Sequence, residues 1–199
     1  MDAAAWVIWL VLFILPAYFA NSVPVLFGGG APIDAGRKWG DGRRLFGEGK
    51  TVRGFFSGVL AGAAVGAVEG MFLAGGNWDI YQGAGALAGS AAAAGGALAA
   101  SAAGSPATYV LAGFLLGCGT MAGDLLGSFI KRRQGLSRGK PSLVMDQLLF
   151  FALAVLFAYP LAHGLLTLQA VLFLAVLTYI VHVGANVLAN RVGLKKVPW

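Results

Sequence analysis

Charged residues are scarce in this sequence. The chain of 199 residues contains 14 Lys and Arg and 8 Asp and Glu, so that 11% of it is charged and 58% is apolar. A soluble domain has about 25% charged residues, which excludes an ordinary water-soluble protein. Several apolar stretches run for roughly 20 residues, the length that crosses the hydrocarbon core of a bilayer, and they indicate an integral membrane protein.

Side chains used in common reactive sites are scarce too. Cys118 is the one cysteine, so an intramolecular disulfide is excluded. The two histidines give no Ser/His/Asp, Cys/His or zinc-type spacing. The apolar stretches lack the alternation of a membrane β-barrel, and their Ala, Gly, Leu, Val and Phe favour helices. We therefore predict an all-α integral membrane protein that forms one transmembrane domain over residues 1–199.

Five membrane-spanning helices are predicted. They cover about 4–24, 54–75, 107–130, 144–163 and 167–190. A sixth stretch, 83–105, consists almost entirely of Ala, Gly and Ser, which suit close packing and predict a re-entrant or surface segment.

The sidedness follows from the basic residues. All Lys and Arg lie in three islands, 37–53, 131–140 and 191–196, and the positive-inside rule places these on the cytoplasmic face. The prediction is a multi-pass protein of the cell membrane, with its N-terminus outside, its C-terminus in the cytoplasm, and cytoplasmic loops at 25–53 and 131–145. A six-span alternative would move either the first island or the other two to the outer face.

The first of these loops, 25–53, is long and rich in glycine and charge. Long loops without secondary structure are usually functional or disordered, and aromatic residues among the charges favour order. Gly49-Lys50-Thr51 resembles the end of a P-loop, but Arg44 stands where that motif needs glycine. Glycine amides, the Lys50 charge and the Thr51 hydroxyl can still bind phosphate. The alternative, a cationic collar for anionic lipid headgroups, leaves Asp34 unexplained.

The run at 119–132 places an acid inside an apolar helix that ends in cations. On a helix, Asp124, Ser128 and the pair Lys131-Arg132 share one face, because they are spaced by about four residues. Glycines repeat every four residues beside this face, so a neighbouring helix can approach closely. An ionised acid inside the membrane is costly unless it is paired or bound to a metal. The alternative is a structural ion pair with another helix.

A second acid, Asp146, begins the next predicted span. Alone it would be explained by the dipole at a helix start. Two acids near one face, with substrate phosphates completing the ligand shell, instead predict a Mg²⁺ site on Asp124 and Asp146. The last span carries His182, Asn186 and Asn190 as a polar stripe, for which packing and substrate contact remain open.

Taken together, these motifs resemble the CTP-dependent cytidylyltransferases that make CDP-activated membrane lipids. The signature is Gly-Asp124, Ser128, Lys131-Arg132, Lys140 and Met-Asp146-Gln. The loop from Pro32-Ile-Asp34 to Arg53-Gly54 is more similar to the archaeal branch, the CDP-archaeol synthases.

The resemblance implies a reaction and a set of residues. CTP and digeranylgeranylglyceryl phosphate, an isoprenoid ether lipid phosphate, would give CDP-archaeol and pyrophosphate with Mg²⁺, at a site facing the cytoplasm. Asp124 and Asp146 would bind the metal and act in catalysis with Lys131 and Arg132. The residues expected to bind substrate are Asp34, Arg43, Lys50, Thr51, Arg53, Ser128, Lys140 and Asn186.

Two other functions fit parts of the sequence. A small transporter or channel could also carry intramembrane acids and anion-binding loops. A CTP-dependent polyprenol kinase would release CDP rather than pyrophosphate. The expected partners are CTP, the lipid phosphate and the bilayer, with no nucleic acid, while a homo-oligomer is left open.

Overall fold

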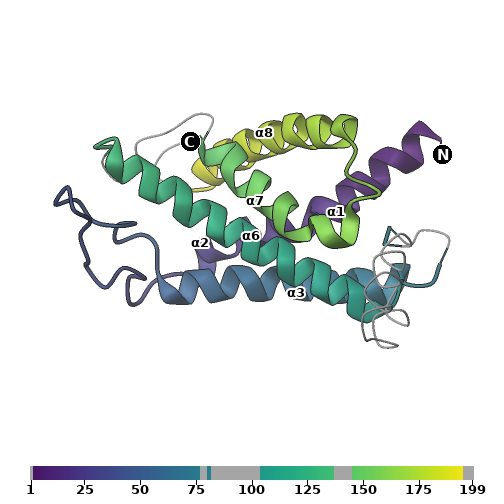
Figure 1. The fold of residues 1–199 in the computed structure, drawn as a ribbon, viewed down its shortest axis with the longest axis horizontal. Helices are drawn as coiled ribbons and strands as arrows, with labels where there is room; N and C mark the ends of the chain where they lie inside the picture. Colours follow the sequence, from purple (N-terminus) through teal and green to yellow (C-terminus); the bar gives the residue numbers. More distant parts are fainter. Residues whose placement is uncertain (1, 77–79, 82–103, 137–144, 195–199) are drawn as a thin grey trace.

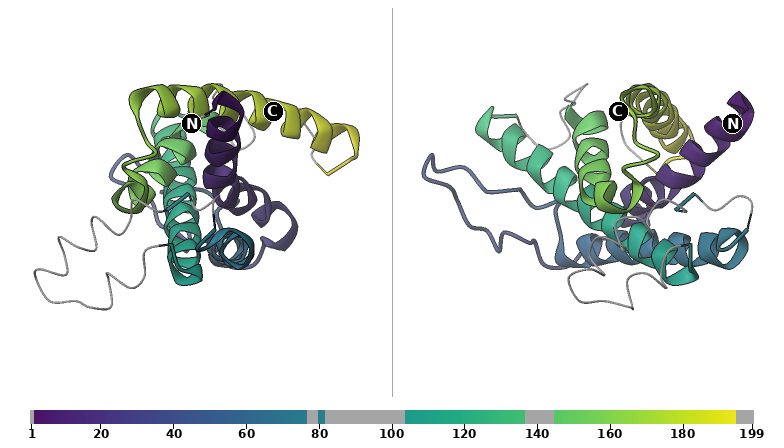
Figure 2. Two further views of the ribbon diagram at one scale, coloured as in Figure 1. Left: turned by 90° about the vertical axis from the view of Figure 1, so that its right-hand side faces the viewer. Right: turned by 45° about the vertical axis from the view of Figure 1, so that its right-hand side comes forward.

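The protein forms a bundle of helices of unequal length, shown in Figures 1 and 2. The structure is a computed structural model that describes residues 2–76, 80–81, 104–136 and 145–194, with the side chains of 145–147 excepted. Its helices are α1 (Ala3–Ser22), α2 (Pro24–Phe27), α3 (Val52–Leu73), α6 (Pro106–Arg133), α7 (Met145–Ala162) and α8 (Leu168–Arg191). The described residues form no sheet, and the prediction of an all-α protein is confirmed.

The helices have the dimensions of membrane spans. Among the described residues, four are long and apolar enough to cross a membrane: Ala3–Phe27, Val52–Leu73, Pro106–Arg133 and Leu168–Arg191. A shorter apolar helix covers Leu148–Ala162. The chain is therefore a multi-pass membrane protein. The crossing of the membrane by α7 and the cytoplasmic position of the basic loops stay predictions. The predicted re-entrant or surface segment 83–105 lies outside the described residues.

Helix ends differ from the predicted boundaries at both basic loops. α6 continues through Lys131, Arg132 and Arg133, which form its last turn, so the loop predicted at 131–145 starts later. Cations at a helix C-terminus interact favourably with the helix dipole and can extend towards water. The other loop is shortened by α2 at one end and by Thr51 at the other, because the Thr51 hydroxyl accepts a hydrogen bond from the Gly54 amide at 3.1 Å and caps α3.

α6 is the central helix, in contact with α1, α3 and α7. Its contact with α3 follows a stripe of buried glycines at every fourth residue of α3, namely Gly54, Gly58, Gly62, Gly66 and Gly70. On α6, Gly113 and Gly117 face this stripe, whereas Gly119 and Gly123 lie against the backbone of α7. The close helix approach predicted from the glycine repeat at 119–127 is thus present at Gly119 and Gly123, where the backbone of α7 leaves no room for a side chain.

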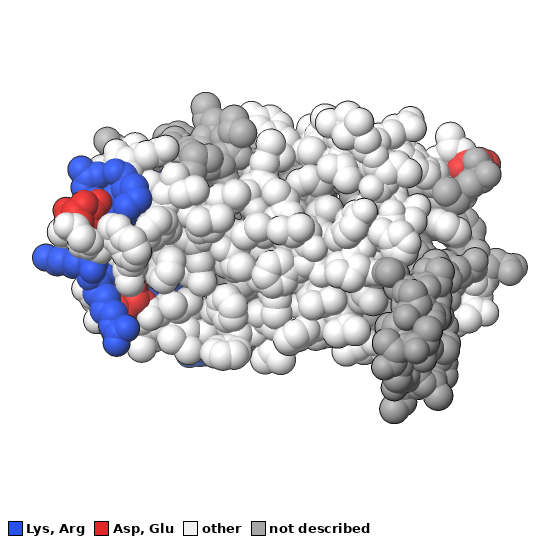
Figure 3. Space-filling view, in the orientation of Figure 1, with Lys and Arg blue, Asp and Glu red and all other residues white. Residues whose placement is uncertain are grey.

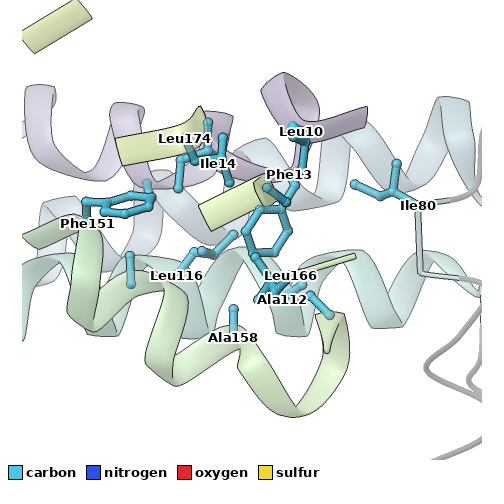
Figure 4. Packing of buried hydrophobic residues seen from close by; sticks show 14 of the residues in the cluster. Leu10, Phe13, Ile14, Ile80, Ala112, Leu116, Phe151, Ala158, Leu166 and Leu174 are labelled. Carbon is cyan, nitrogen blue, oxygen red and sulfur yellow. The ribbon is translucent and has the colours of Figure 1, made fainter. Parts of the chain in front are cut away.

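The hydrophobic core lies between α1, α6, α7 and α8 (Figure 4). Leu10, Phe13 and Ile14 of α1 are fully buried against Leu116 of α6 and Leu174 of α8. Large side chains therefore fill the space between α1, α6 and α8, and glycines bring α6 close to α3 and α7. This arrangement fixes the direction of α6, whose C-terminal end carries the candidate site.

Replacing Gly62 with alanine tests the close contact of α3 and α6. The added Cβ would lie 2.6 Å from the Gly113 carbonyl oxygen, which is backbone and cannot rotate away. We expect Gly62→Ala to lower the free energy of unfolding by about 1–3 kcal/mol, as overpacking does, measured by thermal unfolding in detergent. Gly184→Ala is the matched control, because nothing lies within 4 Å of that position on α8. Equal effects of the two variants would contradict the close contact.

Candidate active site

Charge is concentrated at one end of the molecule. In Figure 3, Lys and Arg gather with acidic residues at the end where the α2–α3 loop meets the end of α6, and the middle of this face is free of charge. The loop runs from Gly28 to Lys50 and lies beside the C-terminal end of α6 (Figure 1). Two neighbouring cavities open here, one between helices and one beneath the loop.

The first, called the helix cavity, has a volume of about 480 Å³. It lies where α1, α2 and α3 meet α6, and both polar and apolar groups line it. The lining residues are Asn21, Pro24, Val25, Gly28, Gly29, Ile33, Gly49, Lys50, Thr51, Gly54, Phe55, Met121, Asp124 and Leu125. Asp124 brings a carboxylate to a wall that is otherwise apolar on the α6 side.

The second, called the loop cavity, has a volume of about 680 Å³. The loop forms one wall and the last turns of α6 form the other. Its lining residues are Arg43, Arg44, Phe46, Gly47, Glu48, Gly49, Lys50, Ser128, Lys131, Arg132, Gly135 and Leu136. Five of these are Lys or Arg and one is acidic, so the cavity is strongly positive and suits a polyanion.

Lys50 lies on the boundary of the two cavities and lines both of them. Its ammonium donates hydrogen bonds of 2.6 Å to both carboxylate oxygens of Asp124. The two side chains are partly exposed, at 27% and 36%, so a ligand can reach them. The structure therefore joins two residues 74 positions apart in the sequence, predicted as a phosphate contact and a metal ligand.

The loop is organised around Asp34. Its side chain is fully buried, and its carboxylate accepts hydrogen bonds from the Arg44 guanidinium at 2.6 Å and from the amides of Gly36, Phe46 and Gly47. Burial acts to raise the pKa of Asp34, but these hydrogen bonds hold it well below the usual range of a carboxyl group. The prediction placed Asp34 among the substrate-binding residues, whereas the structure directs its carboxylate into the loop and away from both cavities.

Thr51 also stabilises the loop through hydrogen bonds. Besides capping α3, its hydroxyl accepts a hydrogen bond of 3.2 Å from the Gly29 amide. Pro32 and Thr51 form an isolated antiparallel bridge, which closes the base of the loop. Thr51 is nearly buried yet lines the helix cavity, so one residue ties the loop to α3 beside the ligand space.

The remaining predicted residues divide into three groups. Arg43, Ser128, Lys131 and Arg132 line the loop cavity, with Ser128 buried in its α6 wall. Arg53 is exposed on the first turn of α3, and Asn186 is buried in α8; neither lines the two cavities. Lys140 and the Asp146 side chain lie outside the described residues.

Arg133 was not among the residues predicted for the site. The Arg133 guanidinium donates to the Asp41 carboxylate at 2.8 Å and to the Arg44 carbonyl at 2.6 Å, and lies over the Phe129 ring. In return, Arg43 donates to the Arg133 carbonyl at 2.6 Å. The sequence signal was only one more basic residue after Lys131-Arg132, because its partners come from a loop about ninety positions away.

The carboxylate of Asp124 has the chemistry of a Mg²⁺ ligand. Mg²⁺ in proteins is held by one or two carboxylates together with substrate phosphates and water. Among the described residues, no group of three or more His, Cys, Asp and Glu side chains forms a complete metal cage. The carboxylate of Asp124 is therefore the one predicted Mg²⁺ ligand whose side chain lies within the described residues, and in this structure it binds the Lys50 ammonium.

Together, these features describe a helical membrane protein with a strongly basic cavity at one end of its helices. The family model described as CarS-like CDP-archaeol synthase matches residues 4–199. The chain is 45% identical to the CDP-archaeol synthase of Pyrococcus horikoshii, over 94% of each chain. It is 46% identical to that of Thermococcus kodakarensis, over 97% of this chain and 96% of the relative.

A solved structure is similar as well. It is described as an intramembrane enzyme for archaeal membrane lipids biosynthesis, and it aligns with a TM-score of 0.62 at 34% identity, covering 89% of this chain and 92% of that chain. The chain belongs to the CDP-archaeol synthase family, and the resemblance found in the sequence is confirmed.

Replacing Asp34 with asparagine tests whether its carboxylate holds the α2–α3 loop in its conformation. An amide offers one acceptor oxygen, so some of the donors now bound by the carboxylate lose their partner, at a cost of about 1–3 kcal/mol for a buried donor. We expect Asp34→Asn to speed hydrogen exchange of the amides at 36, 46 and 47 without unfolding the helices. Glu48→Gln is the control, because Glu48 is 69% exposed in its ion pair with Arg44. Unchanged exchange in Asp34→Asn would contradict this account of the loop.

Proposed function

We propose that this chain transfers the cytidylyl group of CTP to the phosphate of an isoprenoid ether lipid, forming CDP-archaeol and pyrophosphate. The observation that carries the proposal is the pair of cavities that share Gly49 and Lys50 as a wall, in a chain of the CDP-archaeol synthase family. Two adjoining cavities, of which one is lined by five cations and the other by one, suit a reaction between a nucleotide and a lipid phosphate.

In this proposal the loop cavity holds the CTP triphosphate. Lys131 and Arg132 on one wall and Arg43 on the other offer charged donors, and bonds to ionised groups are about twice as strong as neutral ones. The glycines at 47 and 49 leave backbone close to the anion. The cytoplasm is the expected side, because basic helix ends favour it and CTP is made there.

The lipid phosphate enters the helix cavity in this proposal. Its walls at Val25, Phe55 and Leu125 are apolar, whereas Lys50 and Asp124 at the shared boundary are charged. Exposed apolar side chains of α2 beside the opening, Val25, Leu26 and Phe27, can remain in contact with the bilayer. The lipid chains therefore stay in an apolar environment while the phosphate reaches the boundary of the two cavities.

The reaction follows from this placement. An oxygen of the lipid phosphate attacks the α-phosphorus of CTP, and the bond between that phosphorus and the bridging oxygen of pyrophosphate breaks. The lipid phosphate is already an anion at neutral pH, so catalysis consists of positioning and charge neutralisation. Lys131 and Arg132 stabilise the charge that develops on pyrophosphate. When bound by Asp124 and Asp146, Mg²⁺ supplies further neutralisation at the phosphate oxygens.

CTP labelled at two positions distinguishes this function from the rivals. With archaeal lipid phosphate as acceptor, we expect ³²P at the α-position to enter the lipid and ³²P at the γ-position to leave as pyrophosphate. A polyprenol kinase would instead move the γ-label to the lipid and leave the α-label on CDP. A transporter would move neither, and ester-linked acceptors in the same assay define the lipid branch.

Asp124→Asn tests the charged boundary between the cavities. The variant removes the charge that binds Lys50 and the proposed metal, and loss of one such electrostatic group costs about 100- to 1,000-fold in kcat. We expect a fall of that size in label incorporation by folded protein. Asp2→Asn is the control, since Asp2 caps α1, where Asn is an equally good cap. Near-normal turnover of Asp124→Asn would exclude the proposed contribution of Asp124.

A further inference from the structure

The loop cavity has two walls that are distant in sequence. Residues 43–50 form one wall, and residues 128–136 at the end of α6 form the other. The distance between these walls sets the fit of any anion held between them. The contacts that join the loop to the end of α6 therefore decide the shape of the cavity.

Two arginines make this connection reciprocally. Arg43 donates to the carbonyls of Arg132 at 3.3 Å and Arg133 at 2.6 Å, which belong to the end of α6, where carbonyls lack partners within the helix. Arg133 donates in the other direction, to the Asp41 carboxylate at 2.8 Å and to the carbonyls of Arg43 at 3.3 Å and Arg44 at 2.6 Å. The loop and the helix thus each carry a guanidinium that binds the backbone of the other.

Aromatic contacts support the same connection. The Arg133 guanidinium carbon lies 4.9 Å from the centre of the Phe129 ring, one turn earlier on α6. From the loop, the rings of Trp39 and Phe46 lie 5.5 Å and 6.5 Å from Phe129. Arg133 therefore makes the polar contacts with the loop, Phe129 makes the ring contacts with it, and the two side chains lie against each other.

We propose that Arg133 is a positioning residue that holds the loop wall against α6 and thereby sets the affinity for the CTP triphosphate. Arg133 lines neither cavity, although its neighbours Lys131 and Arg132 line the loop cavity. It acts through Arg43 and Arg44, whose carbonyls it binds and whose side chains line that cavity. The inference rests on the proposed placement of CTP in the loop cavity.

The Arg133→Lys variant separates the effect of the guanidinium hydrogen bonds from the effect of the positive charge. Lysine keeps the positive charge, but its single ammonium cannot reproduce a planar guanidinium that serves a carboxylate, two carbonyls and a ring. In full-length protein in detergent, we expect the KM for CTP to rise about tenfold, with kcat and the KM for the lipid within about twofold of wild type. We also expect faster cleavage by trypsin after Arg37 and Lys38, which are exposed on the loop, without nucleotide present.

The Asp41→Asn variant distinguishes the proposal from a purely electrostatic effect on CTP binding, because the two predict opposite changes in the KM for CTP. If Arg133 and Asp41 influenced CTP only through their charges, removing the acid would tighten CTP binding. As a weakened contact of the loop, Asp41→Asn should raise the KM for CTP about two- to threefold and speed trypsin cleavage, because a neutral acceptor binds Arg133 less strongly. The double variant should be no worse than Arg133→Lys alone, since both changes remove one contact.

Arg191→Lys, an exposed residue on the last turn of α8, is the matched control and should behave as wild type. The proposal would be overturned if Arg133→Lys showed wild-type cleavage and a wild-type KM for CTP, or if Asp41→Asn bound CTP more tightly. It would also be overturned if Arg133→Lys had a lower melting temperature and equal rises in both KM values. If wild-type protein incorporated no label from CTP, the proposed function would fail instead. The trypsin comparison would still show whether Arg133 holds the loop.

Discussion

Close backbone contact along α6 is the constraint on which the rest of the structure depends. In a bilayer, burying apolar side chains between helices gains little over leaving them in lipid, so association relies on packing and on polar contacts. Gly113 faces α3 and Gly119 faces α7, so the backbone of α6 contacts the backbone of a neighbouring helix at two interfaces. This leaves α6 little freedom to rotate, and the direction of Asp124 and Ser128 is fixed with it.

The loop between α2 and α3 is stabilised in a different way, because it has no hydrophobic core of its own. Its order comes from a buried charge with a full set of donors: Asp34 accepts from Arg44 and from three backbone amides. Such a carboxylate is costly to bury and is stable only while these partners are in place. The loop can therefore present Arg43 and Lys50 from a defined backbone while the side chains that face the cavities remain accessible.

These two constraints meet at Lys50 and Asp124. The helix contacts bring Asp124 to the boundary between the cavities, and the capped, bridged base of the loop brings Lys50 to it. A nucleotide and a lipid phosphate are both anionic and repel each other, so a site that joins them needs positive charge held in a fixed place. The protein provides it with cations from the loop and from the last turn of α6, which neither element could supply alone.

Much of this was accessible from the sequence. The scarcity of charge, the lengths of the apolar runs and the basic islands predicted helices in a membrane, because these depend on composition and local spacing. The motif around Asp124 and Lys131, with the loop from Pro32 to Gly54, resembled the signature of the family, and the comparisons confirm that resemblance. The predicted span ended at 130, whereas α6 continues to Arg133, because the helix dipole favours cations on the final turn.

Residue roles that depend on distant partners were not accessible in the same way. The membrane helices and the acid inside α6 could be predicted because each follows from residues close together in the chain, and the family could be recognised from motifs at 32–54 and 123–147. The three-dimensional structure was needed to place Asp34 inside the loop, Lys50 beside Asp124, and Arg133 in contact with the loop. Each of those contacts joins residues whose separation is set by how helices pack and how a loop closes, and hydrogen bonds act only over about 3 Å.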